Sequence, residues 1–325
     1  MTNLQIVILN FRTPDMTVKC VETALDEIAA LKAGITAAIT VVENGSEDGS
    51  YDLIRAEGAA RGWLDGRRVA LIDSGWNGGF GSGVNVGIRV GMPGGGRADL
   101  VYLLNSDAFP RPGAVACLID HLATHPEAGI ACSRLRGADD VPHETAFRFP
   151  SAGGEFENAA QTGPISRLLR NKIVALPQPD ANLPVDWSAG ASMMIRAEVL
   201  DQVGLFDETF FLYFEETDLC RRAAKAGWQT HYVWDSVVTH IGSVSTGMKE
   251  WAKVPDYWYD SRQHYFQKHH GRTGALMATL ASLAGNGLWR LRCLIQRREH
   301  RTPPGHYRQM LGRALGKRHD RKGST

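Results

Sequence analysis

Strand-like and helix-like segments alternate through the first 135 residues, and few folds accommodate that order. The expected strands are short apolar runs, each followed by a turn and a stretch with helical periodicity. The strands span residues 4–9, 37–42, 69–72, 100–104 and 130–132, and the helices span 14–31, 51–61, 112–124 and a short stretch ending at 90. Such regular alternation predicts an α/β fold, a parallel sheet with helices on both faces whose ligands bind at the carboxyl ends of the strands.

The pattern is interrupted between residues 136 and 185, where glycine and proline punctuate the sequence. We predict a loop-rich insertion there that serves as a flap. Order then returns as a strand over 187–195, a helix over 197–203, a helix over 215–226, a strand over 230–234 and helices over 256–269 and 276–298.

Charge is distributed unevenly along this chain, although the net charge is only +1. The hydrophobic fraction of 43% and charged fraction of 22% exclude a disordered protein. From Arg290 onward there are 11 Lys or Arg residues against 2 acidic ones, whereas the remainder has 25 against 33. A basic end on an acidic body predicts contact with acidic lipid head groups or with nucleic acid, and a merely solvated end is the alternative.

The five cysteines are scattered, odd in number and without a CxxC pair. This pattern indicates a reducing compartment and disfavours a zinc site or a disulfide framework. No basic region precedes a long apolar run at the N-terminus, so we expect no signal peptide and a cytoplasmic location. The longest apolar tract, residues 274–291, is interrupted by polar residues and glycines and makes a poor membrane span.

Three acidic residues fall within four positions in YFEETDLC, residues 213–220, behind an aromatic-rich stretch. Aromatic side chains exclude water and a helix start favours ionised acids, which suits a group that removes a proton from a hydroxyl. The alternative is that Glu215, Glu216 and Asp218 only cap the helix that Gly227 ends. Since residues three apart share a helix face, Glu215 and Asp218 are expected to point together and Glu216 elsewhere.

Polar residues follow the first two predicted strands: Asn10-Phe11-Arg12, then Glu43-Asn44 and Asp48. At the carboxyl end of a parallel sheet such side chains can hydrogen-bond a base and a ribose. After the third strand comes NGGFGSGVNVG, residues 77–87, whose glycines permit close backbone approach to an anion. This stretch is neither a G-x-G-x-x-G fingerprint nor a P-loop, and a turn used only for tight packing is the alternative.

Asn105-Ser106-Asp107 ends the fourth strand, and His240 follows the last one. A carboxylate in this position can hold a hard divalent cation that also binds a diphosphate. A histidine flanked by small residues could complete the metal shell, or could simply be hydrogen-bonded.

Taken together, these groups resemble the inverting glycosyltransferases of family 2, which have the GT-A fold, and most closely their rhamnosyltransferase-like branch. The matching stretches are IVILNFR, VVENGSEDGS, NGGFGSGVNVG, VYLLNSDAF, DWSAGASMMIR, LFDETFFLYFEETDLCRRAAKAGW and VVTHIGSVS. They occur in the family's order and cover roughly residues 4–245.

The resemblance implies a role for each matched position. The expected nucleotide-sugar contacts are Asn10, Arg12, Glu43, Asn44, Asp48, Asn77, Gly79, Phe80, Asn85, Asn105, Ser106 and Asp107. The expected ligands of Mg²⁺ or Mn²⁺ are Asp107, at the family's DXD position, and His240. Trp187, Gly190 and Ala191 are expected to line the sugar and acceptor pocket. The expected base is Glu216, with Asp218 in reserve and Glu215 as the third acid of the cluster.

Two positions depart from the family pattern. Asn105 replaces the first Asp of the DXD and removes one negative charge from the metal site, and Glu216 replaces an Asp and lengthens the reach of the base by one methylene. The resemblance implies transfer of a sugar, with dTDP-rhamnose the favoured donor, to a lipid-linked or glycan acceptor. A sugar nucleotidyltransferase and a catalytically silent nucleotide-sugar or glycan-binding protein are the alternatives.

The predicted organisation has three parts. Residues 1–250 form a GT-A catalytic domain, with a nucleotide-binding half over 1–135 and an acceptor half over 136–250. Residues 251–315 form a helical C-terminal extension, and residues 316–325 a basic disordered tail. We expect the basic C-terminus to provide a peripheral contact with the inner face of the cell membrane, and we expect no binding of nucleic acid.

Overall fold

The computed structural model describes residues 1–64, 68–242, 254–299 and 302–316, and the chain divides into two compact units. Unit 1 comprises Met1–Phe147, Ala175–Phe211 and Glu215–Lys249. Unit 2 comprises Arg148–Val174, Leu212–Phe214 and Glu250–Thr325. The predicted boundaries differ in that residues 148–174, expected within the acceptor half, group with the C-terminal helices. The predicted tail beyond Gly316 lies outside the described residues.

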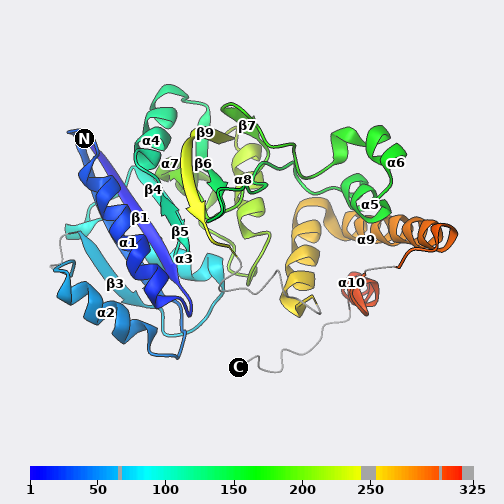
Figure 1. Ribbon diagram of the computed structural model, residues 1–325, viewed down its shortest axis with the longest axis horizontal. Helices are drawn as coiled ribbons and strands as arrows, with labels where there is room; N and C mark the ends of the chain where they lie inside the picture. The colour runs from blue at the N-terminus through cyan, green and yellow to red at the C-terminus, as the bar shows by residue number, and fades with distance from the viewer. Residues whose placement is uncertain (65–67, 243–253, 300–301, 317–325) are drawn as a thin grey trace. The chain divides into compact units, whose positions relative to one another are not determined.

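A twisted sheet forms the centre of unit 1 (Figure 1). Its strands are β1 Thr2–Asn10, β2 Ile35–Glu43, β3 Val69–Asp73, β4 Leu100–Asn105, β5 Ala108–Pro110, β6 Ala128–Arg136, β7 Leu183–Val185, β8 Ser192–Arg196 and β9 Gln229–His240. The helices of unit 1 are α1 Pro14–Ala29, α2 Ser50–Ala60, α3 Phe80–Val90, α4 Ala114–Thr124, α7 Ala197–Val203 and α8 Glu215–Lys225, with a 3₁₀ turn, η1, at Pro93–Gly95. The predicted α/β fold is confirmed.

Across the described residues the strand order is β3-β2-β1-β4-β8-β6-β9-β5, and β7 pairs with β9. The strands β3, β2, β1 and β4 are parallel, as predicted. The fifth predicted strand, β6, does not pair with β4, because β8 lies between them and is antiparallel to both. Alternation along the sequence does not reveal this insertion, and the three-residue strands β5 and β7 were too short to predict.

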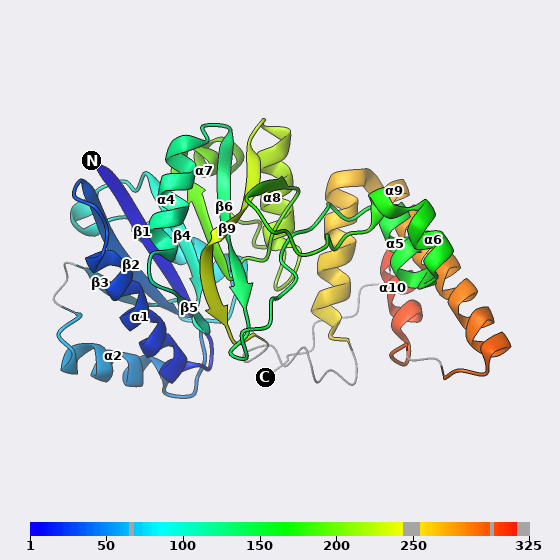
Figure 2. The same ribbon diagram turned by 45° about the horizontal axis from the view of Figure 1, so that its top comes forward.

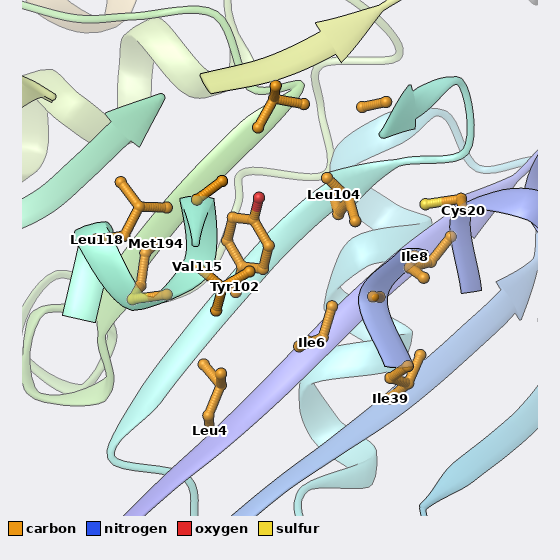
Figure 3. Packing of buried hydrophobic residues seen from close by; sticks show 14 of the residues in the cluster. Leu4, Ile6, Ile8, Cys20, Ile39, Tyr102, Leu104, Val115, Leu118 and Met194 are labelled. Atoms are coloured by element: carbon orange, nitrogen blue, oxygen red, sulfur yellow. The ribbon is translucent and has the colours of Figure 1, made fainter. Parts of the chain in front are cut away.

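The central strand β1 is buried and largely apolar on both faces because helices cover both sides of the sheet. Leu4, Ile6 and Ile8 are 0% exposed and pack with residues of α1 and α4, as Figure 3 shows for part of this cluster. On the opposite face Gly87 of α3 lies so close to Val7 that a side chain at position 87 would overlap it. The glycines of α3 therefore serve close packing, which was one of the two expectations for this stretch.

Unit 2 is helical. Its helices are α5 Ala152–Ala160, α6 Gly163–Leu168, α9 Asp256–Gln296 and α10 His306–Ala314, with a 3₁₀ turn, η2, at Arg170–Lys172. α9 is two helices joined at Gly271 (φ 71°, ψ 176°), and Figures 1 and 2 show a sharp bend between its yellow-orange and orange parts. The helices α5 and α6 fall in the stretch predicted to be loop-rich. α5 begins there because the Ser151 hydroxyl accepts a hydrogen bond from Gly154 N and caps the helix.

Arg262 holds unit 2 together from its interior. Its guanidinium is 2% exposed, lies 2.8 Å from Glu155 Oε2 on α5, and donates to Thr279 Oγ1 in the second part of α9. Arg313 of α10 pairs in turn with Asp256 and Asp260 of α9. The ion pairs hold α5 and α10 against the first part of α9, and the hydrogen bond to Thr279 joins that part to the second.

Candidate active site

The carboxyl ends of four parallel strands carry most of the predicted site residues. The strand register aligns Asn10 with Glu43, Glu43 with Asp73, and Leu9 with Asn105. Residues far apart in sequence therefore meet along one edge of the sheet. This is the edge at which open α/β folds bind ligands.

Glu43 shapes the loop that follows β2. Its buried carboxylate accepts hydrogen bonds from Gly45 N (3.0 Å) and Ser46 N (2.9 Å). The Ser46 hydroxyl accepts from Arg12 N (2.9 Å), and the Ser46 carbonyl accepts from Arg12 Nε (3.3 Å). Asn10 is fully buried, and its side chain bonds Ser46 and Thr17. Glu43 and Asn10 thus form the scaffold, and exposed Arg12 is the group in this set that can reach a ligand.

Asp48 and Asn44 have different positions at this edge. Asp48 is exposed, and its carboxylate accepts from the backbone N (3.0 Å) and the hydroxyl (2.5 Å) of Ser50 at the start of α2. The hydroxyl bond lowers the pKa of Asp48. Asn44 is buried and donates to Asn77 Oδ1 (3.2 Å) and Gly79 O (3.2 Å), joining the β2 loop to the glycine-rich loop.

The glycine-rich loop is held against the segment that leads to the acid cluster. Gly79 has φ +88°, and a Cβ atom there would overlap the carbonyl oxygen of Phe211. That oxygen accepts a hydrogen bond from Phe80 N (3.0 Å), and Asn77 Oδ1 accepts from Gly79 N (3.0 Å). The amide of Phe80 at the start of α3 is thus bonded within the protein.

Asn85 does not have the ligand-facing position predicted for it. Its side chain is 0% exposed, accepts from Phe206 N (3.1 Å), and donates to Phe206 O (2.9 Å) and Glu208 Oε1 (2.9 Å). Every polar atom of the amide is engaged. Asn85 therefore ties α3 to residues 206–208, and the sequence pattern did not distinguish this role from a ligand contact.

Asp107 and His240 come together at the adjoining β5–β9 pair, where Ala108 aligns with His240. His240 Nε2 lies 3.2 Å from Asp107 Oδ1, and Asp107 Oδ2 accepts from Gly242 N (3.1 Å). Ser106 is buried and its hydroxyl lies 2.8 Å from that of Thr13, so it joins β4 to α1.

The donor set suits a divalent cation that is shared with a ligand. Within the described part of the chain, no group of three or more His, Cys, Asp and Glu residues could hold a metal by itself. One carboxylate and one imidazole leave the remaining coordination positions for water and for diphosphate oxygens, which is how Mg²⁺ is usually held in phosphate-handling enzymes. Asn105, half-buried at the end of β4, adds no charge to this set.

The three acids of α8 have separate surroundings. Asp218 is 0% exposed and lies 2.8 Å from Arg222 Nε, and Arg222 also donates to the carbonyls of Val203 and Leu205. Asp218 cannot reach a substrate, so it is not the reserve base that we expected. The i,i+4 spacing of Asp218 and Arg222 was the sequence signal for this ion pair. Glu215 shares a face of α8 with Asp218, as predicted, and that face is buried, with Glu215 only 3% exposed.

Glu216 is the acid of the cluster that remains partly exposed. The Gly190 backbone amide lowers the pKa of its carboxyl, and its Oε2 atom, like Glu215 Oε2, is buried without a hydrogen-bond partner. Burial raises the pKa of Glu216, and the pKa of Glu215 is raised by burial and then by the charge of Glu216. Both acids therefore combine an unpaired carboxylate oxygen with a raised pKa, as a general base does, and Glu216 is the one whose residue is partly exposed.

Gly190 and Ala191 connect Glu216 to the strand that carries the metal-site sequence. A Cβ atom on Gly190 would lie 3.7 Å from Glu216 Cβ and 3.7 Å from Phe80 Cε1. The next residue, Ala191, accepts a hydrogen bond at its carbonyl from Asn105 N (3.0 Å). The acid helix, the glycine-rich loop and the end of β4 therefore converge around this dipeptide.

Trp187 stacks on Phe147, with ring centroids 4.3 Å apart and an interplanar angle of 19°. The two residues also pair through their backbones, since Phe147 N donates to Trp187 O (3.1 Å). Phe147 was not recognised in the sequence, because an aromatic residue in an irregular stretch carries no periodic signal.

The fold has the GT-A architecture of glycosyltransferases, and comparison with known proteins agrees. A mannosyltransferase from Pyrobaculum calidifontis, solved with GDP-Man and Mn²⁺, superposes with a TM-score of 0.56 at 14% identity, covering 96% of this chain and 79% of that one. GalNAc-T7, solved with UDP, GalNAc and Mn²⁺, superposes with a TM-score of 0.56 at 13% identity, covering 90% and 54%.

The chain belongs to the family described as glycosyltransferase like family 2, which it matches over residues 2–261. It is 31% identical over 221 residues to the N-acetylglucosaminyl-diphospho-decaprenol L-rhamnosyltransferase of Mycobacterium tuberculosis, covering 64% of this chain and 68% of that protein. It is 28% identical over 225 residues to the low-salt glycan biosynthesis hexosyltransferase Agl10 of Haloferax volcanii, covering 69% and 62%. The chain is therefore a glycosyltransferase, and the predicted family is confirmed.

Proposed function

We propose that this glycosyltransferase moves rhamnose, with inversion, from dTDP-rhamnose to a hydroxyl of a lipid-linked acceptor in the synthesis of a bacterial surface glycan. The rhamnosyltransferase relative, whose named acceptor is a diphospho-decaprenol, supports the sugar and the acceptor class. The observation that carries the proposal is the position of Glu216: the residue is partly exposed, lies beside Gly190 and Phe80, and has a buried Oε2 atom without a hydrogen-bond partner.

In the proposed reaction Glu216 removes the proton from the acceptor hydroxyl as the oxygen attacks the anomeric carbon. The bond from that carbon to the diphosphate breaks on the opposite side, so the configuration inverts and the nucleoside diphosphate leaves with the electron pair. Gly190 N holds the carboxylate in place, and burial keeps it basic. Preorganisation of this kind lowers the barrier because the base needs no reorientation during the reaction.

Asp107 and His240 are the proposed ligands of Mg²⁺ or Mn²⁺. When bound, the cation supplies positive charge that offsets the charge on the leaving diphosphate. Arg12, Asp48 and Asn77 are the proposed contacts of the nucleotide and the diphosphate, while Glu43, Asn44, Gly79 and Ser106 keep the loops in position. Trp187, Gly190 and Ala191 are the proposed lining of the sugar and acceptor pocket.

The test is a donor panel assayed with Mg²⁺ or Mn²⁺ and a polyprenyl-diphosphate-linked acceptor, measuring released nucleoside diphosphate and the anomeric configuration of the product. Glu216→Gln is expected to lower kcat by about 100-fold or more, because general base catalysis typically contributes 10²–10⁴-fold. The matched control is Glu198→Gln, an exposed acid in the first turn of α7.

Full turnover by Glu216→Gln would remove Glu216 from the mechanism. Release of nucleoside diphosphate from a donor other than dTDP-rhamnose, at a higher kcat/KM, would replace the proposed sugar. The metal assignment would be wrong if wild type were active without a divalent cation. It would also be wrong if the activity of Asp107→Ala depended on the cation as that of wild type does.

A further inference from the structure

The second part of α9 is apolar on two opposite faces, and one of them is uncovered. Ala275, Ala278 and Cys293 are buried against the rest of unit 2. On the other side large apolar side chains lie in solvent, and we call them the apolar stripe: Met277 (57% exposed), Leu280 (43%), Leu288 (37%), Leu291 (54%), Leu294 (78%) and Ile295 (73%).

The sequence spacing of the stripe residues places them on one side of the helix. Steps of three and four residues place side chains on one side of a helix, and the stripe extends for about 27 Å at 1.5 Å per residue. Exposed Ala284 fills the gap between its two ends. At about 100° per residue, Arg290 and Arg292 fall on either side of Leu291, so charge borders the stripe without interrupting it.

Isolated apolar side chains on a protein surface are ordinary, whereas a contiguous row of them marks an interaction site. Of the thirteen large hydrophobic residues that are exposed in the described part of the chain, six belong to the stripe. A surface helix normally has polar or charged residues on the face that points to solvent. The outward face of α9 lacks that polarity over five turns.

The charged residues around the stripe indicate what kind of surface it binds. Residues 254–316 contain 10 Lys or Arg and 3 acidic residues. Two of those acids, Asp256 and Asp260, are occupied by Arg313. Arginines 290, 292, 297 and 298 gather at the C-terminal end of the stripe, beside Trp289. An apolar helix face with basic flanks matches an anionic lipid surface.

We propose that the apolar stripe docks the protein on an anionic lipid surface, with the second part of α9 lying in the plane of the interface. Among the helices of the described residues, none is long and apolar enough to cross a membrane, so the helix lies on the bilayer. This deepens the proposed function, from which it takes only the lipid-linked acceptor. The apolar stripe, rather than the basic tail predicted from the sequence, is the proposed principal contact with the membrane; the tail lies outside the described residues.

The experiment is co-sedimentation of the full-length protein with vesicles of phosphatidylcholine alone and of phosphatidylcholine mixed with phosphatidylglycerol. Wild type is expected to bind the anionic vesicles more tightly, and salt is expected to weaken binding. Leu288→Ser with Leu291→Ser and Ile295→Ser is expected to weaken binding by about tenfold or more for each residue replaced. Leu53→Ser, exposed on α2 of unit 1, is the matched control and should leave binding unchanged.

A second variant tests the charge separately. Arg297→Asn with Arg298→Gln is expected to reduce binding about fivefold for each charge removed on anionic vesicles, and to change nothing on neutral ones. Asparagine tolerates the left-handed conformation of Arg297 (φ 53°). Circular dichroism of both variants establishes that α9 is still folded.

Equal sedimentation of wild type and the triple variant would overturn the proposal. So would a concentration-dependent dimer in analytical ultracentrifugation that the triple variant abolishes, since the stripe would then bind a second copy. Vesicle binding needs no sugar donor or acceptor, so it is independent of the proposed reaction. A second assay separates docking from catalysis: both wild type and the triple variant should transfer sugar to a water-soluble acceptor analogue at the same rate.

Discussion

Residues around the candidate active site hold left-handed backbone conformations although they are not glycine. Arg12 has φ 59°, and Tyr213 and Phe214, directly before Glu215, have φ 68° and 70°. Such conformations cost about 1–3 kcal/mol each and persist where neighbouring structure enforces them. Two in succession turn the chain sharply into α8, so that Glu215 is buried while Glu216 remains within reach of Gly190.

Gly79→Ala is expected to destabilise the protein by more than about 2 kcal/mol, since it adds overlap with Phe211 O to the strain of φ +88°. Gly75→Ala is the matched control, because Gly75 has φ +77° and open space around it. Urea unfolding of both variants isolates the effect of the overlap. Equal losses of unfolding free energy in the two variants would mean that the Phe211 backbone moves to make room for the new methyl group.

Glu215→Gln is expected to raise the free energy of unfolding at pH 7. Burial raises the pKa of Glu215 in the folded protein, so the acid stabilises the fold fully below its unfolded pKa, about 4.3, and less as pH rises through the folded pKa. A neutral amide removes that dependence. Unfolding measured from pH 4 to pH 8 should therefore be flatter in the variant; a parallel shift of the whole curve would contradict this account.

At the scale of elements, three histidines join α4 to β9. His121 Nε2 lies 2.8 Å from His231 Nδ1, and the His121 and His125 rings stack with centroids 4.1 Å apart. Burial, then the neighbouring His125 and His231, lowers the pKa of His121 to about 4, while Glu127 and Asp235 act in the opposite direction. The contact therefore depends on His121 and His231 remaining neutral.

Acidification is expected to loosen this contact. Because the folded pKa of His121 lies below its unfolded value of about 6.5, its contribution to stability is complete above that value and is lost as pH falls toward 4. His121→Gln keeps a polar side chain without the titration. The loss of unfolding free energy between pH 7 and pH 5 should be smaller in His121→Gln than in wild type. His264→Gln, on α9, is the control.

The elements that could be predicted from sequence are those whose local pattern decides their structure. The largely apolar run from Leu4 to Leu9 predicted β1, and the i,i+3 spacing of Glu215 and Asp218 predicted that they share a face of α8. β8 between β4 and β6, and the engagement of Asn85 by Phe206, depend on contacts between distant residues. A single sequence shows which residue types are present at such positions, and not which of their atoms are already bonded.

At the scale of the molecule, the two units depend on different interactions. Unit 1 has the extended apolar core around β1, whereas unit 2 depends on the buried Arg262 and its partners Glu155 and Thr279. Removing one member of a buried ion pair leaves the other charge uncompensated, which costs about 3–5 kcal/mol.

Arg262→Met is therefore expected to loosen unit 2 selectively. Hydrogen exchange should increase in α5 and α10 and stay unchanged in β1 and β4. Arg272→Met, an exposed arginine just beyond the bend of α9, is the control. Uniform acceleration across both units would mean that they unfold as one cooperative body.

The hydrogen bond from Phe80 N to Phe211 O joins the glycine-rich loop to the segment that precedes the base. If the proposed nucleotide sugar shifts the loop on binding, the Phe211 carbonyl moves with it, and binding of the two proposed substrates would then be thermodynamically linked. By reciprocity, any gain in acceptor affinity caused by the nucleotide sugar is returned as an equal gain in affinity for the nucleotide sugar.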